Sequence, residues 1–452
     1  MDHAPPVGPL AVLALQHVLT MYAGAITVPL LVASALNLSV ADTAYLVSAV
    51  LFAGGLVTLL QCVGIGPVGI RLPIMMGVTF VGVMPSIAIA SQPGLGLAGV
   101  YGAAIAAGLI VTLLIPFFSR LRTVLTPTVT GTAMLLIGLS LMQVAVDWAA
   151  GGRGSEDYGS PTNLMLAGLT IGTILLVTRF GTGYLANCAI LLGMAAGYAL
   201  AALLGLVDFS GASAAPSLQL IKPFHFGMPI FDPVAIASMV IVLLITLVES
   251  SGMLMMLGDI VGKPVSRRDL SRGLRADCMG AAVGGLFNSF PCTSYAQNIA
   301  LVSMTGIRSR FVCAGAAVIL LVLALFPKLS ALVAAMPPSV LGGAALVLFG
   351  MVAASGIRSL AAAGLNQSRE DLLIVSVSLG IGLIPSLSER FFVAAPAWLQ
   401  PFTDSGVLLG ILTAIILNIF LRPSRTKAML GCESPETETN CAPAPIVGHA
   451  GG

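Results

Sequence analysis

An acidic residue interrupts one of the most apolar stretches of the chain. Glu249 follows fifteen mostly apolar residues, 234–248, in a sequence where only 8% of residues are charged. A carboxylate is costly inside a membrane and is commonly kept there for a function. The alternative is a residue near a helix end that reaches interfacial water or pairs with a distant arginine. A carboxylate accepts two hydrogen bonds from neighbouring ring N–H groups, which suits a planar, amide-containing heterocycle.

Other side chains could complete a slot for such a ring. Gln297 offers both a donor and an acceptor and can read an opposite N–H/C=O edge. Thr79 and Phe80 could supply a hydroxyl and an aromatic face, although a lone phenylalanine in a membrane helix usually serves packing. We therefore expect the substrate-binding residues to be Glu249, Gln297, Phe80, Thr79, Met253 and Ser294.

Three further polar residues, with Glu249, form a predicted network for proton coupling or structural support. Asp277 either pairs with Arg275 or Arg272 or belongs to the coupling network. His17 is either a member of a proton relay or, as we favour, part of an interhelical hydrogen bond. Asn298 is expected to brace backbone groups that a helix break leaves free.

The composition indicates that these residues lie in a bilayer. The 452 residues are 57% hydrophobic with a mean hydropathy of +1.03, whereas soluble domains are about 45 to 50% apolar. Apolar runs of roughly 17 to 25 residues predict membrane-spanning helices, and strand alternation is absent. The first run, 10–36, reads as a retained span rather than a cleaved signal. A net charge of +2 with dispersed basic residues argues against nucleic-acid binding.

No catalytic or metal-binding motif is evident. The seven cysteines lack C-x-x-C spacing, and neither a disulfide framework nor a metal site is indicated. Paired catalytic carboxylates and a nucleophile elbow are also missing from the sequence. We expect a protein that is not an enzyme and carries no cofactor.

Hydropathy and Gly/Pro breaks divide the chain into fourteen spans. With both termini in the cytoplasm, 16 of the 20 basic residues fall in inner loops and only Arg153, Lys222, Lys328 and Arg390 in outer ones, as the positive-inside rule requires. We expect a multi-pass protein of a bacterial inner membrane, with residues 423–452 as a disordered cytoplasmic tail. The spans begin near residues 11, 44, 76, 97, 127, 163, 185, 233, 270, 296, 311, 331, 370 and 406.

The fourteen spans form two halves of opposite orientation. A cut near residues 210–230 leaves seven spans on each side, and an odd number inverts the second half relative to the first. This is the topology of inverted-repeat transporters, which bind substrate where interrupted helices meet. The third span of each half, 71–82 and 287–298, is broken by Pro and Gly. Each predicts a short extended stretch followed by a half-helix, the alternative being two kinked helices.

The residues resemble those of the nucleobase-ascorbate transporter family, also called nucleobase:cation symporter-2. The stretch 297–306, QNIALVSMTG, is similar to the signature of that family, with Ala300 in place of the usual glycine. Gln16-His17, the Glu249-Ser-Ser-Gly252 run and Arg275-Ala-Asp277 resemble further landmarks in the same order. The resemblance extends over residues 10–422 and is closest to the bacterial uric acid and xanthine permeases.

This resemblance implies an all-α fold of fourteen segments with short strands in spans three and ten that pair at the membrane centre. It implies a core domain, residues 10–125 and 233–327, and a gate domain, residues 126–210 and 328–422. It also implies that residues matching Glu249 and Gln297 bind the base, that the one matching Phe80 lines the site, and that the one matching Asp277 is needed for transport. Proton coupling and a homodimer are common in the family.

The expected substrate is uric acid, followed by xanthine and then uracil. Met253 stands four residues after Glu249 on the same helix face, where uracil carriers of the family tend to have His and many xanthine carriers Asp. Together with Gln297 and Thr79, this methionine points to the uric acid and xanthine branch. The expected function is proton symport of a purine base by alternating access. The alternatives are a uracil permease of the same family or an anion transporter or exchanger with the same fold.

Overall fold

The computed structural model describes residues 3, 5–117, 126–364, 368–388, 390–395 and 405–421. The predicted tail, 423–452, lies outside these ranges. Eight of the helices in these ranges are long and apolar enough to cross a membrane, and a ninth span results if α14 and α15 are taken together. The protein is therefore a multi-pass membrane protein.

The described elements form two sets of seven segments, in the predicted order. The first half contains α1 (Val7–Ala35), α2 (Val40–Val63), β1 (Met76–Val78) with α3 (Val83–Ala90), α4 (Gly96–Leu114), α6 (Pro127–Ala149), α7 (Pro161–Phe180) and α9 (Ala189–Leu203). The second contains α11 (Pro233–Val261), α12 (Arg267–Leu286), β2 (Cys292–Ser294) with α13 (Ala296–Thr305), α14 (Arg310–Ala324), α16 (Pro338–Ala362), α17 (Arg369–Leu387) and α19 (Gly406–Leu421). Short helical turns are η1 (Ile115–Phe117), α8 (Tyr184–Asn187), α10 (Ser210–Ala214) and α15 (Pro327–Ala334). The inverted-repeat prediction is confirmed, including a broken third segment in each half.

One predicted boundary is wrong. The twelfth span begins at Pro338 rather than near residue 331, because residues 327–334 form α15, which is bent by 80° from α14. Pro327 lies at the bend and begins α15, and Pro337 and Pro338 separate α15 from α16. Proline lacks an N–H group, disfavours helical geometry in the residue before it, and fits best in the first turn of a new helix.

Local capping explains where several helices begin. Asp232 precedes α11, and its Oδ1 accepts hydrogen bonds from the N–H groups of Val234 and Ala235 at 3.0 and 2.8 Å. Ser266 caps α12 in the same way, through the N–H group of Asp269 at 3.1 Å. These side chains satisfy amides that have no partner inside the helix.

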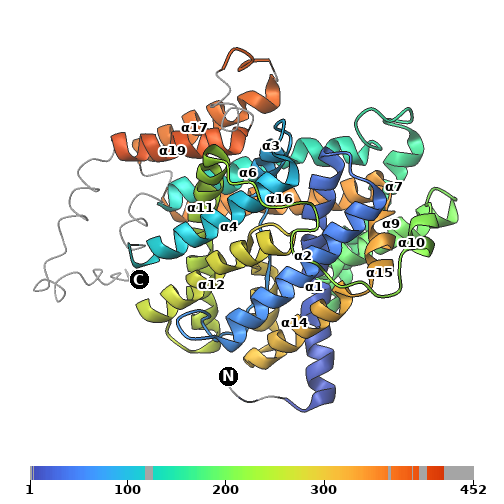
Figure 1. The fold of residues 1–452 in the computed structure, drawn as a ribbon, viewed down its shortest axis with the longest axis horizontal. Coiled ribbons are helices and arrows are strands. Elements are labelled where there is room, and N and C mark those ends of the chain that lie inside the picture. The colour runs from blue at the N-terminus through green and yellow to red at the C-terminus, as the bar shows by residue number, and fades with distance from the viewer. Residues whose placement is uncertain are drawn as a thin grey trace, which may run out of the picture.

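The helices pack in two groups. The first surrounds the strand pair and consists of α1, α2, α3, α4, α11, α12, α13 and α14. The second consists of α6, α7, α9, α16, α17 and α19, with α17 and α19 side by side at one end of the molecule (Figure 1). Glycines allow close contact within each group, because a Cβ at Gly138 of α6 would lie 2.6 Å from the backbone N of Ala353 on α16.

The two broken segments meet as an antiparallel strand pair. Met76 lies opposite Ser294, Gly77 opposite Thr293, and Val78 opposite Cys292. Tyr295 closes the pair, since its hydroxyl donates to the carbonyl of Val78 at 3.1 Å. Its ring lies over Gly77, where an added Cβ would come within 2.5 Å of Tyr295 Cε2. The pairing predicted for spans three and ten is confirmed, and a half-helix follows each strand.

We predict that Gly77→Ala destabilises the protein, because the methyl group overlaps the Tyr295 ring and a buried ring has little room to move. Overpacking of this kind costs about 1 to 3 kcal/mol, visible as a lower melting temperature by fluorescence-detected size exclusion. Gly168→Ala on α7 is the control, since nothing lies within 4 Å of its added Cβ. An unchanged melting temperature for Gly77→Ala would contradict the tight packing described above.

Candidate functional site

Glu249 lies past the middle of α11 with its carboxylate unpartnered. The residue is partly buried, and within the described part of the chain no hydrogen bond or ion pair joins it to another residue. It is followed by Ser250, which is fully buried. A carboxylate in apolar surroundings without a protein partner is open to an external donor.

Gln297 occupies the first turn of α13, directly after β2. Its side chain is partly buried and makes no hydrogen bond to the described residues. No side chain caps this helix at its N-cap residue, Tyr295. The first amides of α13 therefore lack intrahelical partners, and the positive end of the helix dipole lies beside Gln297.

One hydrogen bond joins α11, which carries Glu249, to β2, the strand that leads into α13 and Gln297. The hydroxyl groups of Ser250 on α11 and Thr293 on β2 are 3.0 Å apart and buried. Helix α11 also packs directly against β2 and α13. The structure thus brings together the two elements that carry the principal expected ligands.

The other expected binding residues divide into two pairs. Thr79 is turned into the backbone, since its N–H donates to the carbonyl of Pro291 at 2.9 Å and its Oγ1 accepts from the N–H of Val81 at 3.2 Å. Ser294 similarly donates to Met76 Sδ at 3.7 Å. Phe80 and Met253 are only partly buried. The Phe80 ring packs edge to face against Phe349 of α16, with 5.8 Å between the ring centroids. Phe80 therefore contacts the second helix group.

Asp277 is joined to the strand pair by Gln61 of α2. Gln61 Nε2 donates to Asp277 Oδ1 at 3.2 Å and to the Gly273 carbonyl at 3.0 Å, while its Oε1 accepts from the N–H of Ile70 at 3.0 Å. Asp277 Oδ2 is buried without a partner. The ion pair with Arg275 or Arg272, one of the two alternatives left open by the sequence, does not occur among the described residues. Arg275 is two positions from Asp277, and such residues do not share a helix face.

Gln61 is a residue that our sequence reasoning missed. It is fully buried and takes part in four side-chain hydrogen bonds, which tie α2 to α12, to the segment before β1 and, through Met76 Sδ at 3.9 Å, to β1 itself. A glutamine within the apolar run of α2 is the signal that could have identified it, because polar side chains in spans usually have partners.

His17 and Asn298 connect α1 to α13. Asn298 Nδ2 donates to the His17 carbonyl at 2.9 Å and lies 3.1 Å from His17 Nδ1. Both residues are buried, and Cys313 Sγ lies 3.9 Å from the same ring nitrogen. This geometry suits a brace between helices, and it leaves Asn298 Oδ1 without a partner.

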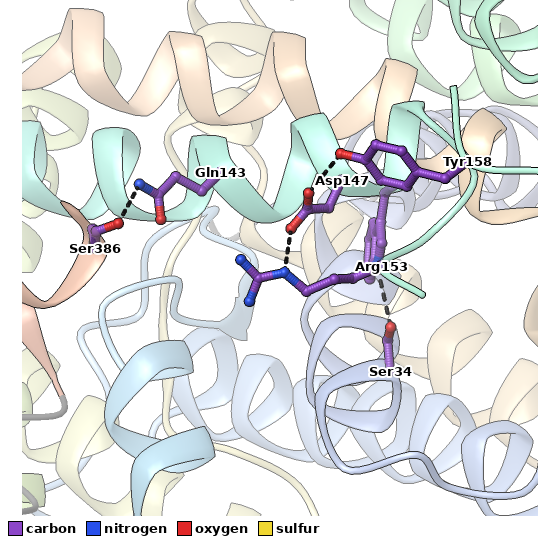
Figure 2. A network of polar contacts seen from close by, with 7 residues as sticks. Ser34, Gln143, Asp147, Arg153, Tyr158 and Ser386 are labelled. Carbon is purple, nitrogen blue, oxygen red and sulfur yellow. Dashed lines mark hydrogen bonds and ion pairs between the residues drawn. The ribbon is translucent and has the colours of Figure 1, made fainter. Parts of the chain in front are cut away.

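A second polar cluster lies between the two helix groups, at the end of α6 (Figure 2). Asp147 accepts a hydrogen bond from the Tyr158 hydroxyl at 2.9 Å and forms an ion pair with Arg153 at 3.4 Å. Gln143 donates to the carbonyl of Ser386 at 2.9 Å. Gln143, Asp147, Arg153 and Ser386 line a cavity of about 190 Å³ that also touches Met84 of α3. None of these residues was predicted as a site residue, and the 78% exposure of the Arg153 side chain limits the strength of the ion pair.

One face of α11 is open beyond Glu249. Gly252, Met256 and Asp259 follow it at helical spacing and are exposed, and nothing lies within 4 Å of an added Cβ at Gly252. In the opposite direction Thr246 and Val242 are fully buried. The exposure of this face of α11 therefore increases from Glu249 towards the C-terminal end of the helix.

Comparison with known proteins identifies close relatives over nearly the whole chain. A model described as a permease family matches residues 8–391. The uric acid transporter UacT of Escherichia coli is 49% identical over 96% of this chain and 90% of its own length. The xanthine permease of Bacillus subtilis is 42% identical over 90% and 92%, and the uric acid permease PucJ of Bacillus subtilis is 41% identical over 95% and 97%.

Solved structures with a similar fold are more distant in sequence. The transmembrane domain of the cyanobacterial bicarbonate transporter BicA has a TM-score of 0.59 at 16% identity, covering 90% of this chain and 97% of that one. The murine anion transporter Slc26a9 has a TM-score of 0.62 at 14% identity, covering 93% and 70%. At these identities the likeness establishes the arrangement of seven plus seven segments.

We predict that Gln61→Ala lowers the melting temperature of the protein more than Gln219→Ala does. The substitution leaves Asp277, Ile70 and Gly273 without their buried partner, and such losses cost about 1 to 3 kcal/mol per unsatisfied group. Thermal unfolding of the purified protein measures the effect. Gln219→Ala serves as the control, because the Gln219 side chain makes no hydrogen bond to the described residues; equal melting temperatures for the two variants would refute the bracing role.

Proposed function

Because the chain belongs to the nucleobase-ascorbate transporter family, we propose that it carries uric acid, and xanthine less well, across the inner membrane together with a proton. The three relatives described above are a transporter and two permeases. The observation that carries the proposal is the unpartnered carboxylate of Glu249 on a helix that packs against the element bearing Gln297.

The proposed site binds the purine by its edges. Glu249 accepts hydrogen bonds from ring N–H groups, and the Gln297 amide pairs with an N–H/C=O edge elsewhere on the ring. The first amides of α13 add donors for a carbonyl oxygen. Phe80 covers one side of the ring, while Thr79 and Ser294 hold the strand backbone in position. Met253 forms an apolar wall, which leaves room for the larger purine.

Two groups of helices suit alternating access. We propose that the group around the strand pair is the core, which carries the substrate, and that α6, α7, α9, α16, α17 and α19 form the gate. Few contacts join the groups, and Phe80 against Phe349 is one of them. The open face of α11 beyond Glu249 fits a state that faces the side of the α11 C-terminus, which the distribution of basic residues assigns to the cytoplasm.

The two intramembrane acids differ in their surroundings, which supports Glu249 as the group that exchanges the coupled proton. Asp277 is held by Gln61, and its carboxyl lies close enough to Ser250 and Glu249 to interact electrostatically with both. Glu249 has a free carboxylate that substrate and proton can both reach. In this proposal Asp277, His17 and Asn298 maintain the core rather than touch the substrate.

An anion exchanger is the competing function from another class. The similar folds of a bicarbonate transporter and an anion transporter raise this possibility, but a small inorganic anion offers no ring N–H groups from which the Glu249 carboxylate could accept hydrogen bonds. A uracil permease of the same family is the nearer alternative, and substrate competition separates the two.

We predict that Glu249→Gln and Gln297→Ala each reduce uptake of radiolabelled uric acid by at least about tenfold, because each removes hydrogen bonds worth roughly 1.5 to 3 kcal/mol when a charged group takes part. Uptake by cells that express the chain is measured with unlabelled uric acid, xanthine and uracil as competitors, with and without a protonophore. Glu156→Gln, in an exposed loop, is the matched control. Normal uptake by Glu249→Gln, or competition by uracil alone, would refute the proposal.

We predict that a cysteine at position 252 reacts with maleimides applied from the cytoplasmic side, because Gly252 is exposed and its added side chain meets no neighbour. The reaction requires water, so labelling also distinguishes a hydrated path from lipid. The seven native cysteines are first replaced, and inside-out and right-side-out vesicles are compared. Thr246→Cys, which is fully buried, is the control. Labelling from the outer side alone would contradict the assigned direction of opening.

A further inference from the structure

Three arginines on one face of α12 line a cavity away from the proposed substrate site. Arg268, Arg272 and Arg275 are spaced four and three residues apart, which places them on the same side of the helix. With Ser271 and the turn at Gly66 and Pro67 they line a cavity of about 510 Å³. The cavity lies between the C-terminal end of α2 and the first turns of α12.

The loop that forms the other wall is fixed in place. Ile65 and Val68 exchange backbone hydrogen bonds at 2.9 and 3.0 Å, which makes a tight turn with Gly66 at its tip. Gly66 adopts a φ of +55°, and no atom lies within 4 Å of an added Cβ there, so its outer side is open to the cavity. The N–H of Gly69 donates to the Arg272 carbonyl at 2.9 Å, which holds the turn against α12.

The arginines of this cavity have no acidic partner among the described residues. No ion pair or side-chain hydrogen bond joins Arg268, Arg272 or Arg275 to the rest of the described chain, and Arg272 Nε is buried with no acceptor. The nearest acid on the helix, Asp269, accepts a hydrogen bond from Ser266 at the N-cap. Three like charges one turn apart repel one another, and a buried guanidinium donor without an acceptor is costly.

We propose that this cavity binds a phosphate group, through the guanidinium forks of Arg268, Arg272 and Arg275. Guanidinium groups match phosphate oxygens in pairs, and the helix N-terminus adds a favourable potential. The phosphate belongs either to the headgroup of an anionic phospholipid or to a soluble phosphate compound. Val63 and Ile65, at the rim, are 47% and 67% exposed, and they offer apolar contacts that suit the acyl chains of a lipid.

A role in membrane orientation alone does not account for the arrangement. The positive-inside effect depends on the number of basic residues near the span ends, and it requires neither a shared cavity nor a buried donor. The proposed site is also independent of the transport proposal, because the arginines are not part of the substrate site. Binding is therefore measured without any uptake assay.

The test uses the full-length protein, purified in detergent and depleted of lipid. Binding is followed by native mass spectrometry and by thermal unfolding during titration with phosphatidylglycerol, with phosphatidylcholine or with sodium phosphate. Arg272→Gln is compared with Arg358→Gln, which removes an equal charge from an exposed position on α16. If Arg272→Gln fails to fold, the exposed Arg268→Gln takes its place.

We expect phosphatidylglycerol to bind in preference to phosphatidylcholine, and Arg272→Gln to weaken that binding at least roughly tenfold while Arg358→Gln leaves it unchanged. If Arg272→Gln weakens the binding of sodium phosphate and the protein does not bind phosphatidylglycerol, the site is supported and its ligand is a soluble phosphate compound. The proposal is overturned if Arg272→Gln and Arg358→Gln bind all three additives equally well.

Discussion

The need to satisfy backbone hydrogen bonds in two broken membrane spans governs the centre of this molecule. A chain that leaves the helix inside a bilayer exposes N–H and C=O groups that lipid does not accept. Here the two interrupted spans, one from each half, satisfy each other as β1 and β2. Side chains complete the set, since Thr58 accepts from the Met76 N–H at 2.9 Å and Tyr295 donates to the Val78 carbonyl. The two halves of the sequence are therefore joined at the positions where each one interrupts a membrane-spanning helix.

The same pairing creates the conditions for binding. Because the strands are antiparallel and each is followed by a half-helix, α3 and α13 start near the strand pair and run away from it. Gln297 lies at the start of α13 for this reason. Ser250, beside Glu249, then contacts Thr293 of β2, so α11 is held in register with the strands. A base bound there would meet a carboxylate, an amide and free backbone donors that no single unbroken helix could supply.

Hydropathy and the Gly/Pro breaks predicted the number of segments and the two inverted halves, whereas the pairing of the strands was predicted from the family resemblance. The breaks at 71–82 and 287–298 were also readable, since Pro and Gly interrupt otherwise apolar runs. Long-range partners were not. Gln61 meets Asp277 across more than two hundred residues, and the arginines near Asp277 left an ion pair open as one of two alternatives. Helical spacing could have excluded Arg275, because Gly273 and Asp277 share the face that Gln61 touches, whereas Arg275 does not.

Glu249 and Asp277 differ in whether the protein itself supplies a hydrogen-bond partner. A binding group that the protein satisfies by itself gains nothing from the substrate, since the ligand must first displace the internal partner. Asp277 accepts a hydrogen bond from Gln61 at one oxygen and is excluded from solvent, although its Oδ2 has no partner. Glu249, one residue before the Ser250 contact, is held in place by its helix and yet has no partner. In the proposed site, a substrate N–H group would supply the hydrogen bond that the protein leaves unmade at this carboxylate.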